Sequence, residues 1–370
     1  MYDVLIMGVS PAGAVTAALL ARQNRSVALV ARDQPTAHLP RTTWVGKDAQ
    51  AILEGIGLSA RDALGPVLKQ LVFHSPDLSQ HATSNVARIG TRLIDRANLL
   101  EQLTAAARRG GAEVFTEDPI VQIELGESLV TASLQSGEAL EAQLLIAADE
   151  VESLLVRHLT HARFHKSLVC HQLDLHPPAQ VLSEFFGTTP LASVAFNCPR
   201  VDASAYVLAG AGRLAVGLAT SADNSTAAEL FAQFCGMAAQ CGLIPSDLPL
   251  KPELADTWLS PAGAAVELET HVAKRAILIG RAGGFVAAVS SQDAYPEMWS
   301  AQLAADVALR ALASSNPQDE MGCFDAAWRT PMARYLQPPN TDLQFLLPLV
   351  FSNSQMADRL ARAILTGQPI

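Results

Sequence analysis

A short glycine-containing segment near the N-terminus, residues 8–13 (GVSPAG), has the spacing of a turn that binds the phosphates of a dinucleotide. Such a site needs a tight turn, close approach of the backbone to the pyrophosphate, and a helix packed near its strand. Gly8 and Gly13 supply the tight turn and the close packing of the helix on its strand. Ser10 stands at the middle position, where its side chain fills space that a glycine would leave to the phosphates, although its hydroxyl can donate a hydrogen bond. The helix start at Pro11 and Ala12 remains an anion site through its N–H groups and dipole. The alternative is a purely structural turn.

The acidic residue that usually accompanies this turn is missing. In dinucleotide-binding units a carboxylate at the end of the second strand bonds the ribose hydroxyls, whereas here the apolar run Val27–Val30 is followed by Ala31 and Arg32. Arg32 is either the partner of a 2′-phosphate, as in NADP sites, or a solvated arginine of the loop. We favour the solvated arginine.

The elements around the glycine segment predict a βαβ unit. Tyr2–Met7 is an apolar run with β-branched residues, Ala14–Arg22 is rich in strong helix formers, and Ser26–Ala31 is a second apolar run. A strand, tight turn, helix and strand in this order form the smallest unit of a parallel sheet. The pattern then predicts helices over Asp48–Ile56 and Ala97–Arg109, a strand over Glu113–Thr116 and a hairpin of Leu129–Leu134 with Leu140–Ala147.

The pattern changes after about residue 163, where strand-like runs, Val181–Phe186 and Ala205–Leu208, precede a predicted helix over Thr226–Gln240. We expect a mixed sheet with a covering helix, inserted as a substrate domain. The strand Ala276–Ile279 and a helix over Met298–Leu312 return to the first domain.

The predicted fold class is therefore α/β. A Rossmann-like dinucleotide-binding domain (1–162 and 270–318) carries an inserted mixed β-sheet substrate domain (163–269) and a helical C-terminal tail (319–370), in which residues 324–336 and 353–365 are expected to be helical.

Charge and composition favour a small-molecule partner. The chain has 370 residues and a formal net charge of −10, which disfavours binding to nucleic acid or to anionic lipid surfaces. Five scattered cysteines without a C-x-x-C pair, and an N-terminus without a secretory signal, are typical of a reduced cytoplasmic protein. The run Phe345–Phe351 is far shorter than the roughly 20 residues of a transmembrane helix. Nothing in the sequence specifies an oligomeric state.

Three further segments, together with residues 8–13, resemble the motifs of one enzyme family. Residues 95–99 (DRANL) are similar to an arginine-containing segment before a long helix, residues 148–153 (ADEVES) to an Ala-Asp-Gly-x-x-Ser stretch, and residues 279–286 (IGRAGGFV) to a late Gly-Asp-Ala-Ala/Gly-Gly motif. The family is that of the FAD-dependent oxidoreductases that includes geranylgeranyl reductases, flavin-dependent halogenases and aromatic-ring monooxygenases. The order of the pieces matches over nearly the whole chain. The resemblance implies a Rossmann-like FAD/NAD(P)-binding domain, FAD as cofactor with Arg96 near it, and NAD(P)H as electron donor.

The chain departs from this family at the residues that hold FAD. The family's late aspartate binds the ribitol chain of the flavin, yet this chain has Arg281, which offers no acceptor. Glu150 replaces a glycine, residues 287–294 lack the proline and glycines that let the backbone approach the isoalloxazine ring, and residues 43–47 (TWVGK) replace a Gly-Glu-Ser segment. The losses predict weak or absent FAD binding, unless Arg281 clamps the pyrophosphate as a bidentate donor.

Other chemistry-bearing residues give weaker signals. His158, His161 and His165 would share one helix face, as metal ligands do, but no acidic or cysteine ligand accompanies them and we expect a polar surface. His271 beside Glu269 is a potential acid/base pair, with a simple surface contact as the favoured interpretation. Trp258, Trp299, Trp328 and Tyr295 are expected to be core residues rather than the lining of an apolar pocket.

Two functions remain open. The first is an FAD-dependent oxidoreductase, of reductase or monooxygenase type, that acts on an apolar isoprenoid or aromatic small molecule. The alternative is a non-redox protein of the same fold that has lost FAD binding, either a ligand-binding protein or an enzyme of another class. No catalytic residue and no metal ligand is assigned. The residues expected to contact the cofactor are Gly8, Ser10, Pro11, Ala12, Gly13, Arg32, Arg96, Gly280, Arg281, Gly283 and Gly284.

Overall fold

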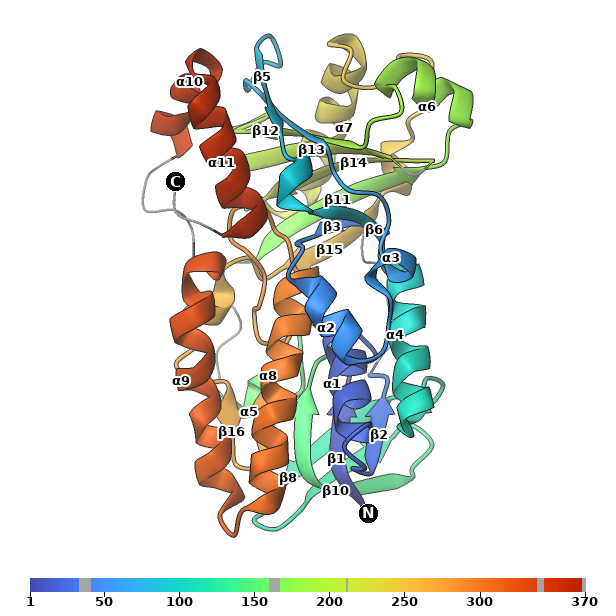
Figure 1. The fold of residues 1–370 in the computed structure, drawn as a ribbon, viewed down its shortest axis with the longest axis vertical. Helices are drawn as coiled ribbons and strands as arrows, with labels where there is room; N and C mark the ends of the chain where they lie inside the picture. The colour runs from blue at the N-terminus through green and yellow to red at the C-terminus, as the bar shows by residue number, and fades with distance from the viewer. Residues whose placement is uncertain (33–40, 160–166, 211, 338–342, 368–370) are drawn as a thin grey trace.

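Two β-sheets lie one above the other along the long axis of the molecule (Figure 1). The computed structural model describes residues 1–32, 41–159, 167–210, 212–337 and 343–367, apart from the side chains at 62, 157 and 158. Within this part of the chain, no helix combines the length and apolar character needed to cross a membrane. Helices cover both sheets, and a two-stranded sheet lies between them.

The lower sheet in Figure 1 carries the predicted βαβ unit. Its strands run in the order β16-β17-β10-β1-β2-β7, with β1 parallel to both β10 and β2. The hairpin of β8 and β9 extends it from β10. The strands are β1 (Tyr2–Met7), β2 (Val27–Val30), β7 (Glu113–Phe115), β8 (Ile120–Leu125), β9 (Val130–Leu134), β10 (Ala139–Ala147), β16 (Val272–Ala273) and β17 (Ala276–Leu278).

Strand β1 is apolar throughout because both of its faces are covered. Val4 and Ile6 pack on the helical side of the sheet, whereas Leu5 and Met7 pack on the side of β8 and β9. A strand buried on both faces reads as a continuous apolar run rather than an alternating one. The helices on the first side are α1 (Pro11–Ala21), α4 (Arg96–Gly110), α8 (Ala294–Ala313) and α9 (Pro317–Leu336).

The upper sheet has the strand order β15-β11-β14-β13-β12-β4-β5. It is mixed, as predicted, because β12 pairs in parallel with β4 while its other pairs are antiparallel. The strands are β4 (Gln70–His74), β5 (His81–Asn85), β11 (Leu168–Leu175), β12 (Leu191–Phe196), β13 (Ala203–Gly210), β14 (Arg213–Thr220) and β15 (Asp256–Ser260). Strands β4 and β5 come from the N-terminal half of the chain, so this sheet is not formed by residues 163–269 alone.

Two groups of helices cover the two faces of this upper sheet. Helices α6 (Ala179–Phe186) and α7 (Asn224–Gln240) pack on one face, and α10 (Leu343–Ser352) and α11 (Ser354–Thr366) pack on the other. The remaining elements are the two-stranded sheet of β3 (Thr42–Val45) and β6 (Arg92–Asp95), the helices α2 (Ala49–Gly55), α3 (Ala60–Ala63) and α5 (Val156–Leu159), and the 3-10 turns Ala87–Ile89, Pro252–Leu254 and Ala264–Val266.

One predicted element is wrong. The run Val181–Phe186, expected as a strand, forms the last six of the eight residues of helix α6, which begins after Pro178. Leu182 is buried and Phe186 packs against the same apolar cluster, so the two lie four residues apart on one helix face. A run this short does not distinguish period two from period 3.6.

Candidate functional site

The glycine turn at the end of β1 is tight because backbone meets backbone there. Gly8 has a φ of +112°, and a Cβ on it would lie 2.5 Å from the Asp149 nitrogen. A Cβ on Gly13 would lie 2.1 Å from the Gly8 carbonyl oxygen. Both glycines are therefore required by the packing of the chain on itself, and their presence does not depend on a bound phosphate.

The Ser10 hydroxyl takes up an N–H group of the first helical turn that could otherwise bind an anion. Its hydroxyl donates to the Ala148 carbonyl at 2.6 Å and accepts the Gly13 N–H at 3.1 Å, so that it caps helix α1. Pro11, at the first helical position, has no N–H. The Ala12 N–H is thus the donor that this first turn keeps for an anion, and Ser10, Pro11 and Ala12 are themselves buried.

Arg32 points back toward the sheet rather than into solvent. Its side chain is 18 % exposed, and its Nη1 lies 3.5 Å from a carboxylate oxygen of Asp149. The expectation of a solvated loop arginine is therefore wrong. Burial raises the pKa of Asp149 to about 7, against the opposing effect of the Arg32 charge. Arg32 has an internal partner where the ribose carboxylate of a dinucleotide site would be expected.

The late glycine motif meets the first one. Gly280, with a φ of +59°, lies so close to the start of α1 that a Cβ on it would be 2.8 Å from the Ala12 Cβ. Gly283 and Gly284 instead face other neighbours: the Gly283 carbonyl lies 2.9 Å from His271 Nε2, and a Cβ on Gly284 would be 2.5 Å from the Ala265 nitrogen. The structure thus brings Gly280 to the predicted phosphate turn and leaves the other two glycines to packing.

Arg281 is the centre of a buried ion network. Its side chain is 2 % exposed. The Nε atom donates to Glu150 at 2.8 Å, Nη1 to Asp293 at 3.0 Å, and Nη2 to the Leu259 carbonyl at 2.6 Å. Every nitrogen of the guanidinium therefore has an acceptor within the protein, and three of its five N–H groups are engaged there rather than turned toward a pyrophosphate.

Arg96 joins this network from the other side. It donates to the second carboxylate oxygen of Asp293, and its Nη1 lies 3.6 Å from Glu297. Helix α4 places Arg96 and helix α8 places Glu297, while Asp293 immediately precedes α8. The sequence predicted Arg96 and Arg281 as cofactor contacts, and the structure brings them together on one carboxylate.

The charges of this network come close to balance without a ligand. Despite burial, Arg96 and Arg281 hold the pKa of the Asp293 carboxyl below its usual value. Despite burial, Glu150 and Asp293 raise the pKa of the Arg281 guanidinium. Glu297 differs, because burial and the nearby Asp293 raise the pKa of its carboxyl to about 8. Two arginines thus face two ionised carboxylates, with Glu297 protonated at neutral pH.

This state of Glu297 predicts a loss of stability with rising pH. Its pKa is about 8 in the folded protein against a usual 4.5, so the folded state holds a proton that the unfolded state releases. The free energy of unfolding therefore falls as the pH rises from about 4.5 to about 8. We expect Glu297→Gln to be more stable relative to wild type at pH 8.5 than at pH 5.5, measured as denaturation midpoints at roughly those two values.

The exposed Glu101 of α4 supplies the control for this experiment. Glu101→Gln should leave the difference between the two pH values unchanged. The groups that face Glu297, namely Asp293, Arg96, Arg281 and Glu150, are retained in both variants. A Glu297→Gln variant whose stability relative to wild type is the same at both pH values would contradict the assignment of a buried, protonated carboxyl.

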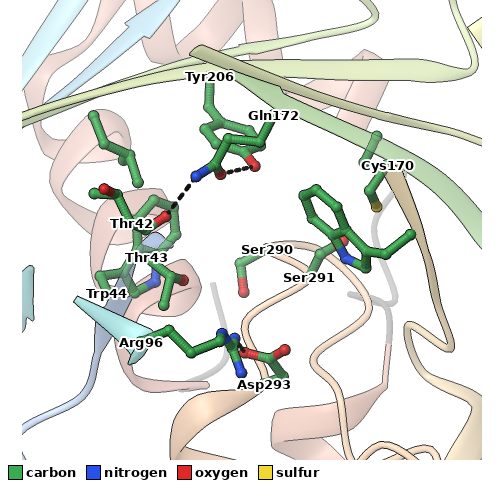
Figure 2. Close-up of a pocket in the computed structure, with 13 residues that line it drawn as sticks. Thr42, Thr43, Trp44, Arg96, Cys170, Gln172, Tyr206, Ser290, Ser291 and Asp293 are labelled. Carbon is green, nitrogen blue, oxygen red and sulfur yellow. Dashed lines mark hydrogen bonds and ion pairs between the residues drawn. The ribbon is translucent and has the colours of Figure 1, made fainter. Parts of the chain in front are cut away.

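A pocket lies between this network and the upper sheet (Figure 2). In that view Tyr206 and Gln172 lie at its top, and Arg96 and Asp293 at its bottom. The space is about 40 Å³, which is room for about three water molecules. The residues that line it are Thr42, Thr43, Trp44, Arg96, Cys170, Gln172, Tyr206, Leu208, Ala219, Trp258, Ser290, Ser291 and Asp293.

The sequence suggested that His271 makes a surface contact with Glu269. In the structure it is a core residue instead. It is fully buried, with Nδ1 3.1 Å from Asp325 and Nε2 2.9 Å from the Gly283 carbonyl. Asp325 lies on α9, so this histidine joins α9 to the late glycine motif. With both ring nitrogens engaged, it has no nitrogen left for acid/base chemistry on a ligand.

The remaining sequence candidates have different outcomes. Trp328 is a fully buried core residue, and Trp299 and Tyr295 pack against the same core, whereas Trp258 lines the pocket. His161 and His165, and the side chain of His158, lie outside the described residues. Among the described residues there is no cluster of three or more metal-ligating side chains.

Asp293 and Glu297 were not predicted, although they are central to the network. Their spacing of four residues would place both carboxylates on one helix face, but the predicted helix began only at Met298, whereas α8 begins at Ala294. The spacing does not predict which residues pair with these carboxylates, because Arg96 is 197 residues away from Asp293 in the chain.

Comparison with known proteins assigns this fold. The sequence profile described as "FAD binding domain" matches residues 1–209, which is more than half of the 370 residues. The chain belongs to the FAD-binding domain family. The expected kinship with FAD-dependent oxidoreductases is therefore confirmed, as is the Rossmann-like α/β fold. A search of curated proteins gives no match.

Several solved structures have a similar fold over almost the whole chain. A geranylgeranyl bacteriochlorophyll reductase-like protein from Thermoplasma acidophilum has a TM-score of 0.73 at 15 % identity, covering 100 % of this chain and 92 % of its own. A triple mutant of a flavin-dependent brominase has 0.74 at 14 % identity, covering 99 % and 94 %. A flavoprotein/dehydrogenase from Cytophaga hutchinsonii has 0.72 at 17 %, covering 99 % and 92 %. At these identities the likeness shows the fold.

The residues present do not fit FAD in the way that this FAD-binding family holds it. The position of the ribitol-binding aspartate carries Arg281, a donor whose nitrogens are all used within the protein. The helix start next to the phosphate turn is capped by Ser10. The ribose end carries Arg32, whose Nη1 lies 3.5 Å from a carboxylate oxygen of Asp149. The fold is retained, but the FAD contacts are replaced by internal ones.

Proposed function

We propose that this chain is a non-redox member of the FAD-binding fold, a small-molecule-binding protein or an enzyme of another reaction class. The observation that carries the proposal is the buried Arg281, whose guanidinium is held by Glu150, Asp293 and the Leu259 carbonyl. Dismantling such a network to admit FAD would leave buried charges without partners, which costs about 3–5 kcal/mol for each broken pair. Free cysteines and an acidic net charge support a cytoplasmic location as part of the proposal.

The first test is the interaction of the purified protein with FAD. We expect colourless protein without the flavin absorbance band at about 450 nm, and no rise in melting temperature when FAD is added. A ligand present at 100 times its Kd would stabilise the protein by about 2.7 kcal/mol, so retained binding would be visible. Yellow protein, or a saturable rise in melting temperature with FAD, would overturn the proposal.

A rescue variant checks the physical reason for the loss. Arg281→Asp combined with Asp293→Gly removes the guanidinium and leaves one carboxylate for Arg96, so the buried charges remain balanced. We expect this double variant to bind FAD more tightly than wild type in a fluorescence titration.

Membership of the family favours a second candidate function. It is an FAD-dependent oxidoreductase of reductase or monooxygenase type that acts on an apolar isoprenoid or aromatic molecule and takes electrons from NAD(P)H. The matched family profile and the presence of Arg96 near the expected flavin position support it. The same FAD titration separates the two candidates, since this one requires tight flavin binding.

A further inference from the structure

His271 lies between two groups that both accept hydrogen bonds. Its Nδ1 is 3.1 Å from a carboxylate oxygen of Asp325, and its Nε2 is 2.9 Å from the carbonyl oxygen of Gly283. A neutral imidazole carries a proton on one ring nitrogen and a lone pair on the other, whereas the imidazolium donates from both. If Asp325 is ionised, only the imidazolium satisfies the two contacts together.

The surroundings of Asp325 keep its carboxyl ionised. Thr270 donates its hydroxyl to this carboxylate at 2.6 Å, the backbone N–H of His271 donates at 3.0 Å, and the indole N–H of Trp328 at 3.3 Å. Burial opposes ionisation, but the hydrogen bonds from His271 and Thr270 lower the pKa of the Asp325 carboxyl to about 2. A neutral ring would therefore hold a bare nitrogen lone pair against either this carboxylate or the Gly283 carbonyl.

Three aromatic rings separate this histidine from water. The ring centroids of Phe285 and Trp328 lie 5.1 Å from that of His271, and the centroid of Phe324 lies 6.2 Å away. The histidine itself is 0 % exposed. A polar atom in such a position depends on partners within the protein, so the two acceptors decide how many protons the ring carries.

The other charged side chains of the segments around this ring are engaged elsewhere or lie at the surface. Arg329 of α9 donates to two backbone carbonyls just before β16. Arg281, in the late glycine motif, belongs to the ion network. The side chains at 157 and 158 of α5 lie outside the described part of the chain. Those before and after β16 are the exposed Glu267, Glu269 and Lys274.

Two histidines of the upper sheet show what burial does without a carboxylate beside the ring. Burial lowers the pKa of His171, whose Nδ1 lies 2.9 Å from the hydroxyl of Thr257, a group that can donate or accept. Burial, and then the nearby His81, lower the pKa of His74 to about 4. A neutral ring suits both of these places, whereas His271 has an acceptor on each side.

We propose that His271 is a buried imidazolium that clamps the late glycine motif (residues 279–286) to helix α9, and that loss of its ring proton opens this clamp. The clamp runs from the Gly283 carbonyl through the ring to Asp325 on α9, which lies beside β16 (Figure 1). Without the proton, one of the two contacts becomes a repulsion between lone pairs. The proposal concerns a pH-sensitive device of the fold and holds whether or not the protein binds FAD.

The clamp acts on a turn that carries part of the candidate site. Within the motif, the Gly284 N–H donates to the Arg281 carbonyl, and the Phe285 N–H donates to the Gly280 carbonyl. The same turn holds the Arg281 side chain in the ion network and Gly280 against the start of α1. Release of the Gly283 carbonyl is therefore expected to loosen the motif while the rest of the lower sheet stays folded.

NMR of the wild-type protein with 15N-labelled histidine rings tests the charge directly. The chain has nine histidines, and contacts to the rings of Phe285 and Trp328 identify the signals of His271. At about pH 7 we expect both ring nitrogens of His271 to carry a proton, and the rings of His171 and His74 to carry one proton each. A neutral His271 ring in this spectrum would overturn the proposal.

Hydrogen exchange over a rising pH series tests the clamp. After correction for the intrinsic exchange rate, the amides of Gly284 and Phe285 should lose protection by at least about tenfold, with the midpoint at which the His271 ring signals change. The amide of Ile6 in β1, paired within the lower sheet, should keep its protection over the same range. Unchanged protection of Gly284 and Phe285 while the ring loses its proton would overturn the clamp.

A matched pair of variants on α9 tests the role of the carboxylate. Asp325→Asn keeps the shape of the side chain and removes its charge, so both the ring signals and the exchange should change at lower pH than in wild type. Asp319→Asn makes the same change at an exposed position of α9 and should leave the midpoint unchanged. Equal midpoints in wild type and Asp325→Asn would contradict the proposal, and the wild-type measurements decide it independently of either variant.

Discussion

Replacing Asp293 with asparagine is expected to lower the free energy of unfolding by about 3–5 kcal/mol, because it removes the carboxylate that two buried arginines share. Arg96 would then keep only Glu297 at 3.6 Å, and Arg281 would keep the half-exposed Glu150. Buried cations without a counter-charge are among the most costly defects in a protein interior. The measurement is the shift of the denaturant midpoint between wild type and Asp293→Asn.

The matched control is an ion pair of the same chemistry at the surface. Arg200 and Asp202 form a two-bond pair with 46 % and 34 % of their side chains exposed. Asp202→Asn should change the free energy of unfolding by no more than about 1 kcal/mol, because solvent screens such a pair. Equal effects of Asp293→Asn and Asp202→Asn would show that the network around Arg281 is not sealed from water, which contradicts the argument against FAD.

The second large effect is expected at the glycine turn. Gly13→Ala places a Cβ about 2.1 Å from the Gly8 carbonyl oxygen, a distance that no relaxation of a side chain can relieve. We expect it to cost about 3 kcal/mol or more of stability in the protein as purified, without any added nucleotide. If instead the turn were shaped by a bound phosphate, the loss would appear in ligand affinity with little change in the stability of the ligand-free protein.

Gly236, inside helix α7, is the control for this substitution. A Cβ there would meet no atom within 4 Å. Gly236→Ala should therefore stabilise the protein by up to about 1 kcal/mol, since alanine is the better helix former. The two substitutions add the same methyl group and have opposite expected signs, and thermal unfolding of both variants measures the difference. Similar behaviour of the two would contradict the packing role of Gly13.

The sequence predicted the nucleotide-binding half of the fold well, because its signals are local. Residues 2–31 contain a doubly buried strand, a turn that tolerates only glycine at Gly8 and Gly13, and a helix of small residues, each of which has a specific pattern. The helix over Val181–Phe186 was mistaken for a strand because six residues span less than two turns. Its helical character depends on tertiary packing of Leu182 and Phe186 against the upper sheet.

The ion network was predictable only in part. The sequence showed that Arg281 and Glu150 replace an aspartate and a glycine of the family, and both changes lie in the network. That the two residues pair with each other, and that Asp293 joins Arg281 to Arg96, depends on contacts between segments 131 and 197 residues apart. Hydrophobic periodicity carries no information on such pairs, because it describes which face of an element is buried and not which element lies opposite.

The path of the chain between the two sheets has a consequence for how any ligand enters and leaves. The chain passes from β2 to β4, back through β6 to α4, up again from β10 to β11, down from β15 to β16, and finally from α9 to α10 (Figure 1). Two layers joined by so many connections of the chain cannot separate by rotation about a single hinge. Exchange at their interface must then proceed by small rearrangements of side chains and loops, so residence times are expected to be long even for a weak ligand.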